Sequence, residues 1–450
     1  MIRPTRARAI ALFAAILIIV GGPFWKSARA AEKSRTRVLV VGIDAGEWDV
    51  LGPLLDQGKC PNFARLRAQG GAGKLRSIVP LTRSPVIWTT IATGKGPQKH
   101  GIQDFFMRTG LSEPGDDPAE DAPVKHREPS KPMTSNLWKA RAVWDILGGL
   151  GKTVGVIGWW ITWPAQPVNG VLVSDYVQYK FGEPRSGPRT VYPDSLGSLV
   201  ERLRVKPEDV SWAELFQFVA PFDTTSNALR ARREELIHDV KWIYAADMTF
   251  YRVGLELYRQ KRSDFFAVYF RGVDELGHLY WDAESFNLQH DIRPPTKEEL
   301  AWMEPLIPNY YVFTDRMLGD FLKEAGRNTD VIVCSDHGFG GGGQGVRAHK
   351  PDGIIFMMGP HVVKGGTISG ATVFDITPTI LAMFGLPTAQ DMDGRPIATG
   401  LKPELVKRME RETRLPTYET ARAEKKGEEP LRSPVDEELR ERLRSLGYIQ

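Results

Sequence analysis

Residues 33–44 read KSRTRVLVVGID, a charged lead-in followed by an unbroken apolar run that ends at an aspartate. Continuous apolar runs are typical of parallel strands that are buried on both faces of a sheet. Similar runs occur at 264–272 (DFFAVYFRG) and at 330–336 (DVIVCSD). Bounded apolar segments predict further strands at 73–79, 152–160, 170–175 and 353–359.

Helical segments are predicted between these strands. The longest cover about 226–260 and 297–325, and a shorter one covers 372–385. The segment SPVIWTTIATG (84–94) has a proline at its start and a glycine at its end, as helices commonly do. Because strands and helices alternate along most of the chain, the sequence predicts an α/β fold with a mainly parallel central sheet and helices on both faces.

The predicted domain organisation is one catalytic domain over residues 34–400. Two segments interrupt the alternation, at about 107–137 and about 178–225, and we expect them to be insertions over one edge of the sheet. Residues 401–450 form a highly charged C-terminal tail without a convincing strand. This tail is predicted to be peripheral helix or partly disordered chain.

The first 30 residues have the features of a signal peptide. Three arginines precede the apolar stretch ALFAAILIIVGG (11–22), and the small-residue pattern SARAA (27–31) follows it. We therefore expect an exported protein, periplasmic or extracellular, with cleavage after Ala30 or Ala31. The alternative is an uncleaved N-terminal membrane anchor, for which the apolar stretch is barely long enough.

Charge and cysteine content exclude some classes of function. The 59 lysines and arginines against 55 aspartates and glutamates give a net charge of only +4, spread along the chain. A nucleic-acid-binding surface usually needs a concentrated basic stripe, so no binding to a nucleic-acid polymer is expected. The two cysteines, Cys60 and Cys334, are expected to be separate buried thiols, although an exported protein could pair them.

Acidic and imidazole side chains follow several predicted strands at the point where each strand ends. Asp44 ends the first strand, and Asp336 and His337 end the strand VIVCS. Functional residues of open α/β sheets lie at the carboxyl ends of strands, so these groups should meet at one edge. Two further histidines and one aspartate belong to the same set: Asp274 and His278, which follow DFFAVYF with helical i, i+4 spacing, and His349, which precedes GIIFMMG.

Carboxylate and imidazole groups together suit borderline divalent cations such as Zn²⁺, with Mn²⁺ or Fe as alternatives. Six such groups are more than one tetrahedral site needs, and their number fits two metal ions that share a substrate. Each residue alone has a simpler structural interpretation, such as a turn or cap residue. The metal-site prediction depends on the whole set.

Several stretches together resemble the alkaline phosphatase superfamily, in its type I phosphodiesterase and nucleotide pyrophosphatase branch. They are VVGIDAGEWDVL (40–51), PNFARL (61–66), SPVIWTTIATGKGPQKHGI (84–102), FRGVDELGH (270–278), SDHGF (335–339) and AHKPDGI (348–354). The resemblance implies an alkaline-phosphatase-like fold and two metal ions, usually zinc. One ion would be held by Asp44, Asp336, His337 and the nucleophile oxygen, and the other by Asp274, His278 and His349.

The resemblance also implies a serine or threonine nucleophile sixteen residues before the histidine of the HGI stretch. Counting back from His100 gives Ser84, with Thr82 as the alternative. Ser84 directly precedes Pro85 at a predicted helix start, so its hydroxyl would lie at the positive end of the helix dipole. Without the resemblance, an ordinary N-cap serine would be the preferred interpretation.

The function that the resemblance implies is an exported two-metal hydrolase of phosphoric esters, more a phosphodiesterase than a monoesterase, which acts through a phospho-serine intermediate. Its substrate would be a small phosphate ester or an envelope lipid or glycan. The family's nucleotide pyrophosphatases have an asparagine after HGI that contacts phosphate, whereas this chain has Asp104 and Phe105 there, which puts nucleotide preference in doubt.

Other functions remain as alternatives. A phosphoryl-group transferase acting on envelope lipids or glycans would share the phospho-serine step, and a catalytically silent envelope binding protein would keep only the fold. A sulfatase is disfavoured, because SPVIW lacks the x-Pro-x-Arg pattern that follows a formylglycine precursor. Four cations near the expected ligands, which could bind an anion or be solvated surface charges, are Arg83, Arg271, Arg347 and Lys350.

Overall fold

The computed structural model describes residues 35–80, 82–107, 131–179, 189–290, 292–341, 348–419, 427 and 429–448. The predicted signal segment lies outside these ranges, as do Arg347 and most of the insertion at 107–137. In the described ranges, no helix combines the length and the apolar character that crossing a membrane requires.

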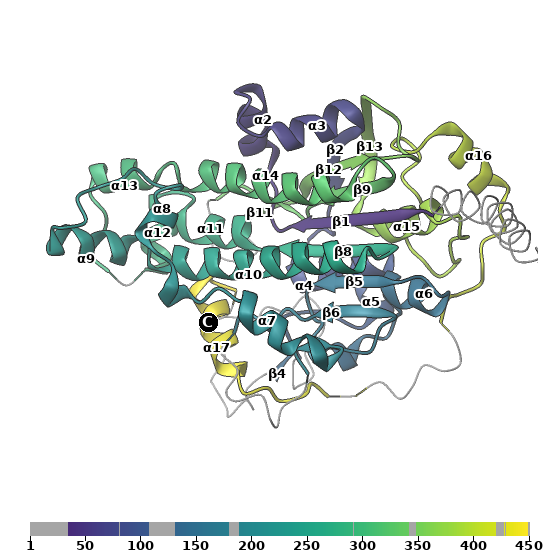
Figure 1. The fold of residues 1–450 in the computed structure, drawn as a ribbon, viewed down its shortest axis with the longest axis horizontal. Helices are drawn as coiled ribbons and strands as arrows, with labels where there is room; N and C mark the ends of the chain where they lie inside the picture. The colour runs from purple at the N-terminus through teal and green to yellow at the C-terminus, as the bar shows by residue number, and fades with distance from the viewer. Residues whose placement is uncertain are drawn as a thin grey trace, which may run out of the picture.

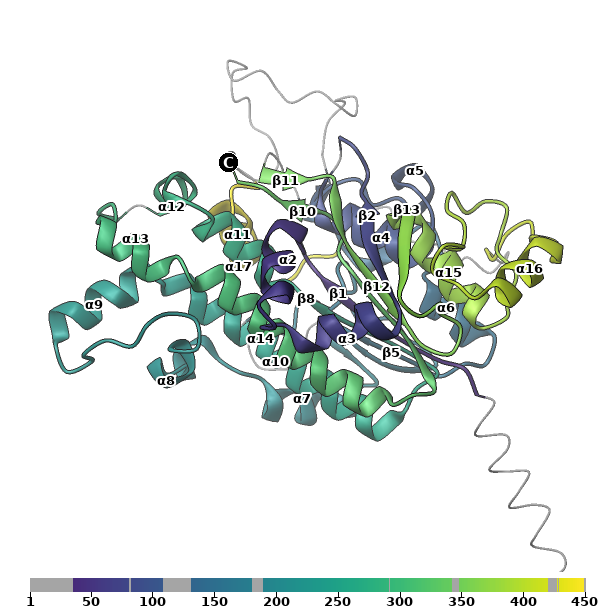
Figure 2. The ribbon, with the colours of Figure 1, turned by 90° about the horizontal axis from the view of Figure 1, so that it is seen from above.

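The core is a nine-stranded sheet in the order β13-β2-β12-β9-β1-β8-β5-β6-β7 (Figures 1 and 2). Only β12 and β7 run against the other strands, so the expectation of a mainly parallel sheet is confirmed. The strands are β1 (Arg37–Ile43), β2 (Gly71–Arg76), β5 (Val154–Ile157), β6 (Gly170–Val173), β7 (Val191–Tyr192), β8 (Phe265–Phe270), β9 (Thr329–Cys334), β12 (Asp352–Met358) and β13 (Gly366–Thr372).

Helices cover both faces of this sheet. Successive side chains of a strand point to opposite faces, and β1 shows the result: Leu39 and Val41 belong to one apolar cluster, whereas Val38 and Val40 belong to another. The first cluster includes α2 (Trp48–Asp56), α3 (Pro61–Gln69), α10 (His238–Lys261), α11 (Gly272–Tyr280) and α14 (Leu306–Ala325). The second includes α4 (Ser84–Thr93), α6 (Val143–Gly149) and α15 (Ile376–Met383).

Several predicted boundaries shift. The segment expected to be one helix at 226–260 is two, α9 (Asn227–Leu236) and α10, which meet at Ile237. The strand expected at 152–160 ends at Ile157, because Gly158 adopts a positive φ of 70° that turns the chain. The remaining helices are α5 (Pro97–His100), α7 (Gly197–Leu203), α8 (Trp212–Leu215), α12 (Ala283–Gln289), α13 (Lys297–Met303), α16 (Pro403–Arg411) and α17 (Asp436–Ser445).

The two cysteines and the three tryptophans of GWWITWP (158–164) are all buried. Cys60 and Cys334 are unpaired, as expected. Trp159 and Trp163 are almost fully enclosed in the second apolar cluster, whereas Trp160, of the same cluster, also lines a pocket.

The described part of the tail is partly helical, as predicted, but its last helix, α17, is not peripheral. The α17 segment, defined as residues 436–448, buries Leu439 and Leu443 in the second apolar cluster. Arg442 bridges two carboxylates, with Nη1 2.6 Å from Oδ1 of Asp239 and Nη2 2.7 Å from Oε2 of Glu275. The α17 segment is therefore fixed to both α10 and α11, and it lies beside them in Figure 2.

Arg442→Met is expected to lower the free energy of unfolding by about 3 kcal/mol, because removing one partner of a buried ion pair leaves the other charges uncompensated. Thermal denaturation and limited proteolysis check this, and α17 should become the first cleaved segment. Arg440→Met is the matched control: its partner Glu437 is exposed, so its loss should cost less than about 1 kcal/mol. Equal losses in the two variants would contradict the anchoring role of Arg442.

Candidate active site

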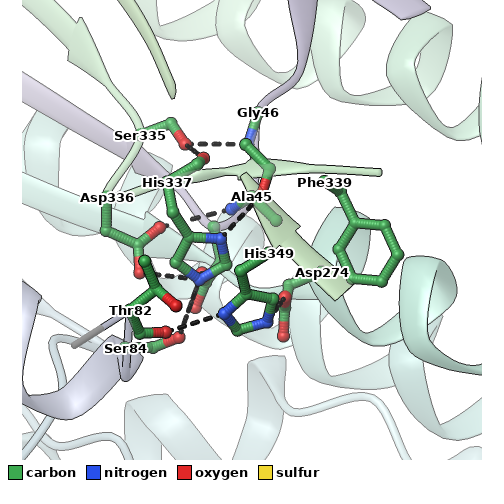
Figure 3. Close-up of polar contacts among 12 residues, drawn as sticks. Ala45, Gly46, Thr82, Ser84, Asp274, Ser335, Asp336, His337, Phe339 and His349 are labelled. Atoms are coloured by element: carbon green, nitrogen blue, oxygen red, sulfur yellow. Dashed lines mark hydrogen bonds and ion pairs between the residues drawn. The ribbon is translucent and has the colours of Figure 1, made fainter. Parts of the chain in front are cut away.

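All the predicted site residues meet at one edge of the sheet. Asp44 follows β1, Asp336 and His337 follow β9, and α11 presents Asp274 and His278 on one face. Because β12 runs antiparallel to β9, its amino end lies at this same edge. The small sheet β10 (Gly338–Phe339) and β11 (His349–Lys350) pairs Phe339 with His349, which brings this histidine next to His337 (Figure 3).

The first group consists of Asp44, Asp336, His337 and Ser84. Nε2 of His337 lies 3.4 Å from Oδ1 of Asp44 and 3.3 Å from Oδ2 of Asp336. Oγ of Ser84 lies 3.3 Å from Oδ1 of Asp44 and 3.3 Å from Nε2 of His337. Ser84 is the first residue of α4, as predicted, and all four side chains are almost fully buried.

The second group consists of Asp274, His278 and His349. Oδ1 of Asp274 lies 3.3 Å from Nε2 of His278 and 3.4 Å from Nε2 of His349. The two Nε2 atoms are 2.9 Å apart. The rings of His337 and His349 stack with centroids 3.7 Å apart, so the two groups are direct neighbours.

Backbone carbonyls fix the tautomers of two histidines. Nδ1 of His349 lies 2.7 Å from the carbonyl oxygen of Thr82, and Nδ1 of His337 lies 3.1 Å from that of Gly338. A carbonyl oxygen can only accept, so each Nδ1 carries a hydrogen that it donates. Nε2 of each ring then keeps its lone pair, as a metal-ligating histidine requires.

The donor set fits two divalent ions. Both groups contain only oxygen and imidazole nitrogen donors, and a tetrahedral Zn²⁺ with bonds of about 2.0–2.1 Å would hold its ligands about 3.3 Å apart. Oδ2 of Asp336 and Oδ1 of Asp274 are buried without a hydrogen-bond partner, which is costly unless a cation is present.

Burial dominates the electrostatics of the first group. Burial and the nearby charge of Asp274 raise the pKa of Asp44 to about 6, although hydrogen bonds with Asp336 and Tyr269 oppose this rise. Burial and the charge of Asp44 raise the pKa of Asp336 well above its usual range, and burial lowers that of His337. Without a cation, the site thus disfavours charge on each of these groups.

The backbone passes close to the site at two residues, Ala45 and Gly338. Ala45 adopts a positive φ of 53°, rare for a residue with a side chain, and its N–H donates to Oδ1 of Asp336 at 3.3 Å. Gly338 leaves no room for a side chain, since a Cβ atom there would come within 2.5 Å of the carbonyl oxygen of Asp352. The chain therefore passes close to the site at Gly338, and residues 342–347 lie outside the described part of the chain.

The cations near the site are engaged by carboxylates. Nη1 of Arg83 lies 2.6 Å from Oδ2 of Asp104, and the guanidinium of the buried Arg271 lies 3.7 Å from Oε1 of Glu275. Lys350 contacts two carboxylates on α2 and its N-cap, Asp49 at 2.6 Å and Glu47 at 3.5 Å. The interpretation as solvated surface charge is therefore wrong for Arg271.

Sequence reasoning missed two tyrosines. The hydroxyl of Tyr269, on β8, donates to Oδ2 of Asp44, and the hydroxyl of Tyr448 contacts all three residues of the second group. Tyr269 could have been found, because it lies two residues before Arg271 at the end of a strand that leads to the site. No local sequence signal identifies Tyr448.

A small pocket adjoins both groups, and Asp44 and Asp274 line it together. Aromatic side chains form much of the wall, and Arg271 and Arg442 add two paired cations. The other lining residues are Trp160, Tyr179, Tyr269, Glu275, Leu443, Leu446 and Tyr448. The pocket therefore places aromatic rings and two paired cations beside one aspartate of each group.

The sequence profile of the type I phosphodiesterase / nucleotide pyrophosphatase family matches residues 38–379. No curated protein sequence showed a significant match. Solved structures with a similar chain path include murine ectonucleotide pyrophosphatase / phosphodiesterase 5 (14% identity, TM-score 0.42, 78% of this chain and 95% of that chain). Another is phosphonoacetate hydrolase from Sinorhizobium meliloti 1021 (16% identity, TM-score 0.37, 68% of this chain and 56% of that chain). A third is a 2-O GAG sulfatase (11% identity, TM-score 0.46, 81% of this chain and 74% of that chain).

Proposed function

The chain belongs to the type I phosphodiesterase / nucleotide pyrophosphatase family of the alkaline phosphatase superfamily, and we propose that it hydrolyses phosphoric diesters with Ser84 as nucleophile. Family membership makes it a metal-dependent hydrolase of phosphoric esters. The finer proposal adds two divalent ions, expected to be Zn²⁺, and a substrate that is a small phosphate ester or an envelope lipid or glycan. It also includes export, with residues 1–30 as the signal peptide.

One observation carries the proposal: Oγ of Ser84 lies 3.3 Å from both Oδ1 of Asp44 and Nε2 of His337. An ordinary N-cap serine would accept a hydrogen bond from its own helix, but the N-cap of α4 is Arg83, and Ser84 is the first residue inside the helix. Ser84 instead directs its hydroxyl at the acidic and imidazole groups, which supports the assignment of a nucleophile over that of a cap.

Asp44 and Ser84 have separate roles in the proposed reaction. Oδ1 of Asp44 accepts the hydrogen of the Ser84 hydroxyl, and the oxygen attacks phosphorus in line with the ester oxygen that leaves. The ester bond breaks, the leaving alcohol takes up a proton, and a phospho-serine remains until water hydrolyses it. When bound, the two ions would lower the pKa of the serine hydroxyl and offset the charge on the phosphoryl oxygens.

The residues that would hold the ions follow from the two groups. Asp44, Asp336, His337 and Oγ of Ser84 would hold one ion, and Asp274, His278 and His349 would hold the other. The helix dipole of α4 adds a positive potential at Ser84, where the phosphoryl group would lie.

Metal analysis combined with a substrate panel tests the proposal. Purified full-length protein should contain about two divalent ions per chain and should hydrolyse bis(p-nitrophenyl) phosphate faster than p-nitrophenyl phosphate. A chelator should abolish turnover, and added Zn²⁺ should restore it. Fewer than one ion per chain together with no turnover would overturn the proposal. An alcohol-dependent phosphorylated product would show a transferase instead.

Asp104→Asn is expected to raise kcat/KM for an anionic phosphodiester by up to about tenfold. The carboxylate of Asp104 lies beside Arg83, the residue before Ser84, and removing its charge would free Arg83 to attract the substrate. Asn keeps the oxygen that accepts from the N–H of Phe105. Steady-state kinetics at low ionic strength check this, with Asp352→Asn as the control at an exposed arginine pair. A decrease in kcat/KM would show that the Arg83–Asp104 pair is itself needed.

A further inference from the structure

Tyr448, which follows α17, places its hydroxyl among the three residues of the second group. Its Oη lies 2.8 Å from Nε2 of His278, 3.3 Å from Nε2 of His349 and 2.9 Å from Oδ2 of Asp274. Among these contacts the hydroxyl can donate only one hydrogen. Since Nε2 of His349 keeps its lone pair, at least one of the contacts to His349 and Asp274 brings two lone pairs together, an arrangement typical of atoms that share a cation.

The position of this oxygen matches that of Ser84 in the first group. Oγ of Ser84 lies 3.3 Å from each of two atoms of that group, and Oη of Tyr448 lies 2.8–3.3 Å from three atoms of the second. Asp274, His278 and His349 provide three donors, whereas a tetrahedral ion takes four. Oη of Tyr448 occupies the place of the fourth donor.

The surrounding packing holds Tyr448 in this place. Arg442 pairs with Glu275, one residue after Asp274, and so fixes the α17 segment to the helix that supplies two ligands. Leu446 is buried in the first apolar cluster, and the ring of Tyr448 lies 4.6 Å from that of Phe105, centroid to centroid. The phenol is therefore part of a packed structure and does not belong to a loose chain end.

We propose that Tyr448 is the fourth protein ligand of the second metal ion in the resting enzyme. The inference rests on the proposed two-metal function. It gives the α17 segment a direct part in the metal site, joining residues 448 and 274 through one ion. The phenol would compete with water for this position, so its loss should weaken binding of the second ion and leave the first ion in place.

Zinc competition against a chromophoric chelator tests the proposal in full-length protein that has been stripped of metal. We expect two zinc affinities in the wild type, and Tyr448→Phe should weaken one of them by about tenfold or more while the other stays unchanged. The unchanged constant shows that the variant is folded around the first group. Tyr179→Phe is the matched control, because Tyr179 lines the same pocket and should leave both affinities unchanged.

A spectroscopic measurement identifies the ligand directly. Protein loaded with Fe³⁺ should show a visible phenolate-to-iron charge-transfer band in the wild type and in Tyr179→Phe, but not in Tyr448→Phe. Unchanged zinc affinities in Tyr448→Phe, or a band that persists in this variant, would overturn the assignment of Tyr448 alone. A wild type that binds no more than one zinc ion would overturn the two-metal function and this inference together.

Discussion

Ser84→Ala is expected to lower kcat on bis(p-nitrophenyl) phosphate by about 10⁴-fold or more, because the reaction loses the oxygen that attacks phosphorus. The side chain is fully buried, and the smaller methyl group should fit without strain. Wild-type protein stopped by acid during turnover should contain phospho-serine at position 84, and the variant should contain none. Stopped turnover assays and mass spectrometry of the quenched protein measure these two results.

Thr82→Val is the matched control for the nucleophile. Thr82 is the other candidate nucleophile, but it contacts His349 through its backbone carbonyl oxygen, which the substitution retains. We expect less than about a threefold change in kcat, in the range of a neutral substitution. If Thr82→Val were inactive and Ser84→Ala active, Thr82 would be the nucleophile and the assignment of Ser84 would be wrong.

Asp336→Asn is expected to reduce activity by about 10³-fold, because the variant loses an anionic ligand of the first ion and several kcal/mol of transition-state stabilisation with it. The residual protein should retain about one ion per chain, held by the second group. Elemental analysis after gel filtration and steady-state kinetics measure the two effects. Asp330→Asn is the control, since Asp330 lies on the same strand and pairs with His361, away from the site.

In metal-free protein, Asp336→Asn should increase the free energy of unfolding, although it lowers activity. The pKa of Asp336 is raised by burial and by Asp44, so its stabilising contribution is present at low pH and is lost as pH rises through the folded-state pKa. Asparagine does not ionise, so the variant does not lose stability in this way as the pH rises. Metal-free Asp336→Asn should therefore exceed metal-free wild type by about 1–3 kcal/mol at neutral pH, with the difference shrinking toward pH 4.

With metal bound, wild type should remain more stable than Asp336→Asn, because an ion that binds only the folded state stabilises it. Thermal melts with and without chelator at pH 4 and pH 7.5 provide the comparison. If Asp336→Asn were less stable than wild type in all four conditions, Asp336 would have a structural partner other than a cation.

The sheet and the two groups were predictable because they follow from local patterns. Apolar runs such as 37–43 and 265–270 identify buried strands, and the parallel arrangement places their carboxyl ends together. Asp44 and Asp336 could then be placed at one edge, and the i, i+4 spacing placed His278 beside Asp274. These inferences needed no knowledge of how distant segments pack.

The features that were not predicted depend on packing between distant segments. Arg442 and Tyr448 lie in a charged segment whose composition resembles solvated helix, and only the carboxylates of α10 and α11 explain their burial. The pair of Arg83 with Asp104 joins two loops whose approach the sequence does not reveal. Composition favoured peripheral helix or partly disordered chain for the tail, but it could not show which surface a helix there would cover.

The α17 segment also affects the order in which parts of the protein fold. The atoms that meet around the second group come from residue 274 to residue 448, and the neighbouring first group begins at residue 44. Contacts between such distant positions close the longest loops of the chain, so they form late in folding. During synthesis, the residues of both groups, which lie between 44 and 349, leave the ribosome well before Tyr448 does. A nascent chain that has already built its sheet, whose strands lie between residues 37 and 372, would therefore still lack Tyr448 beside the second group.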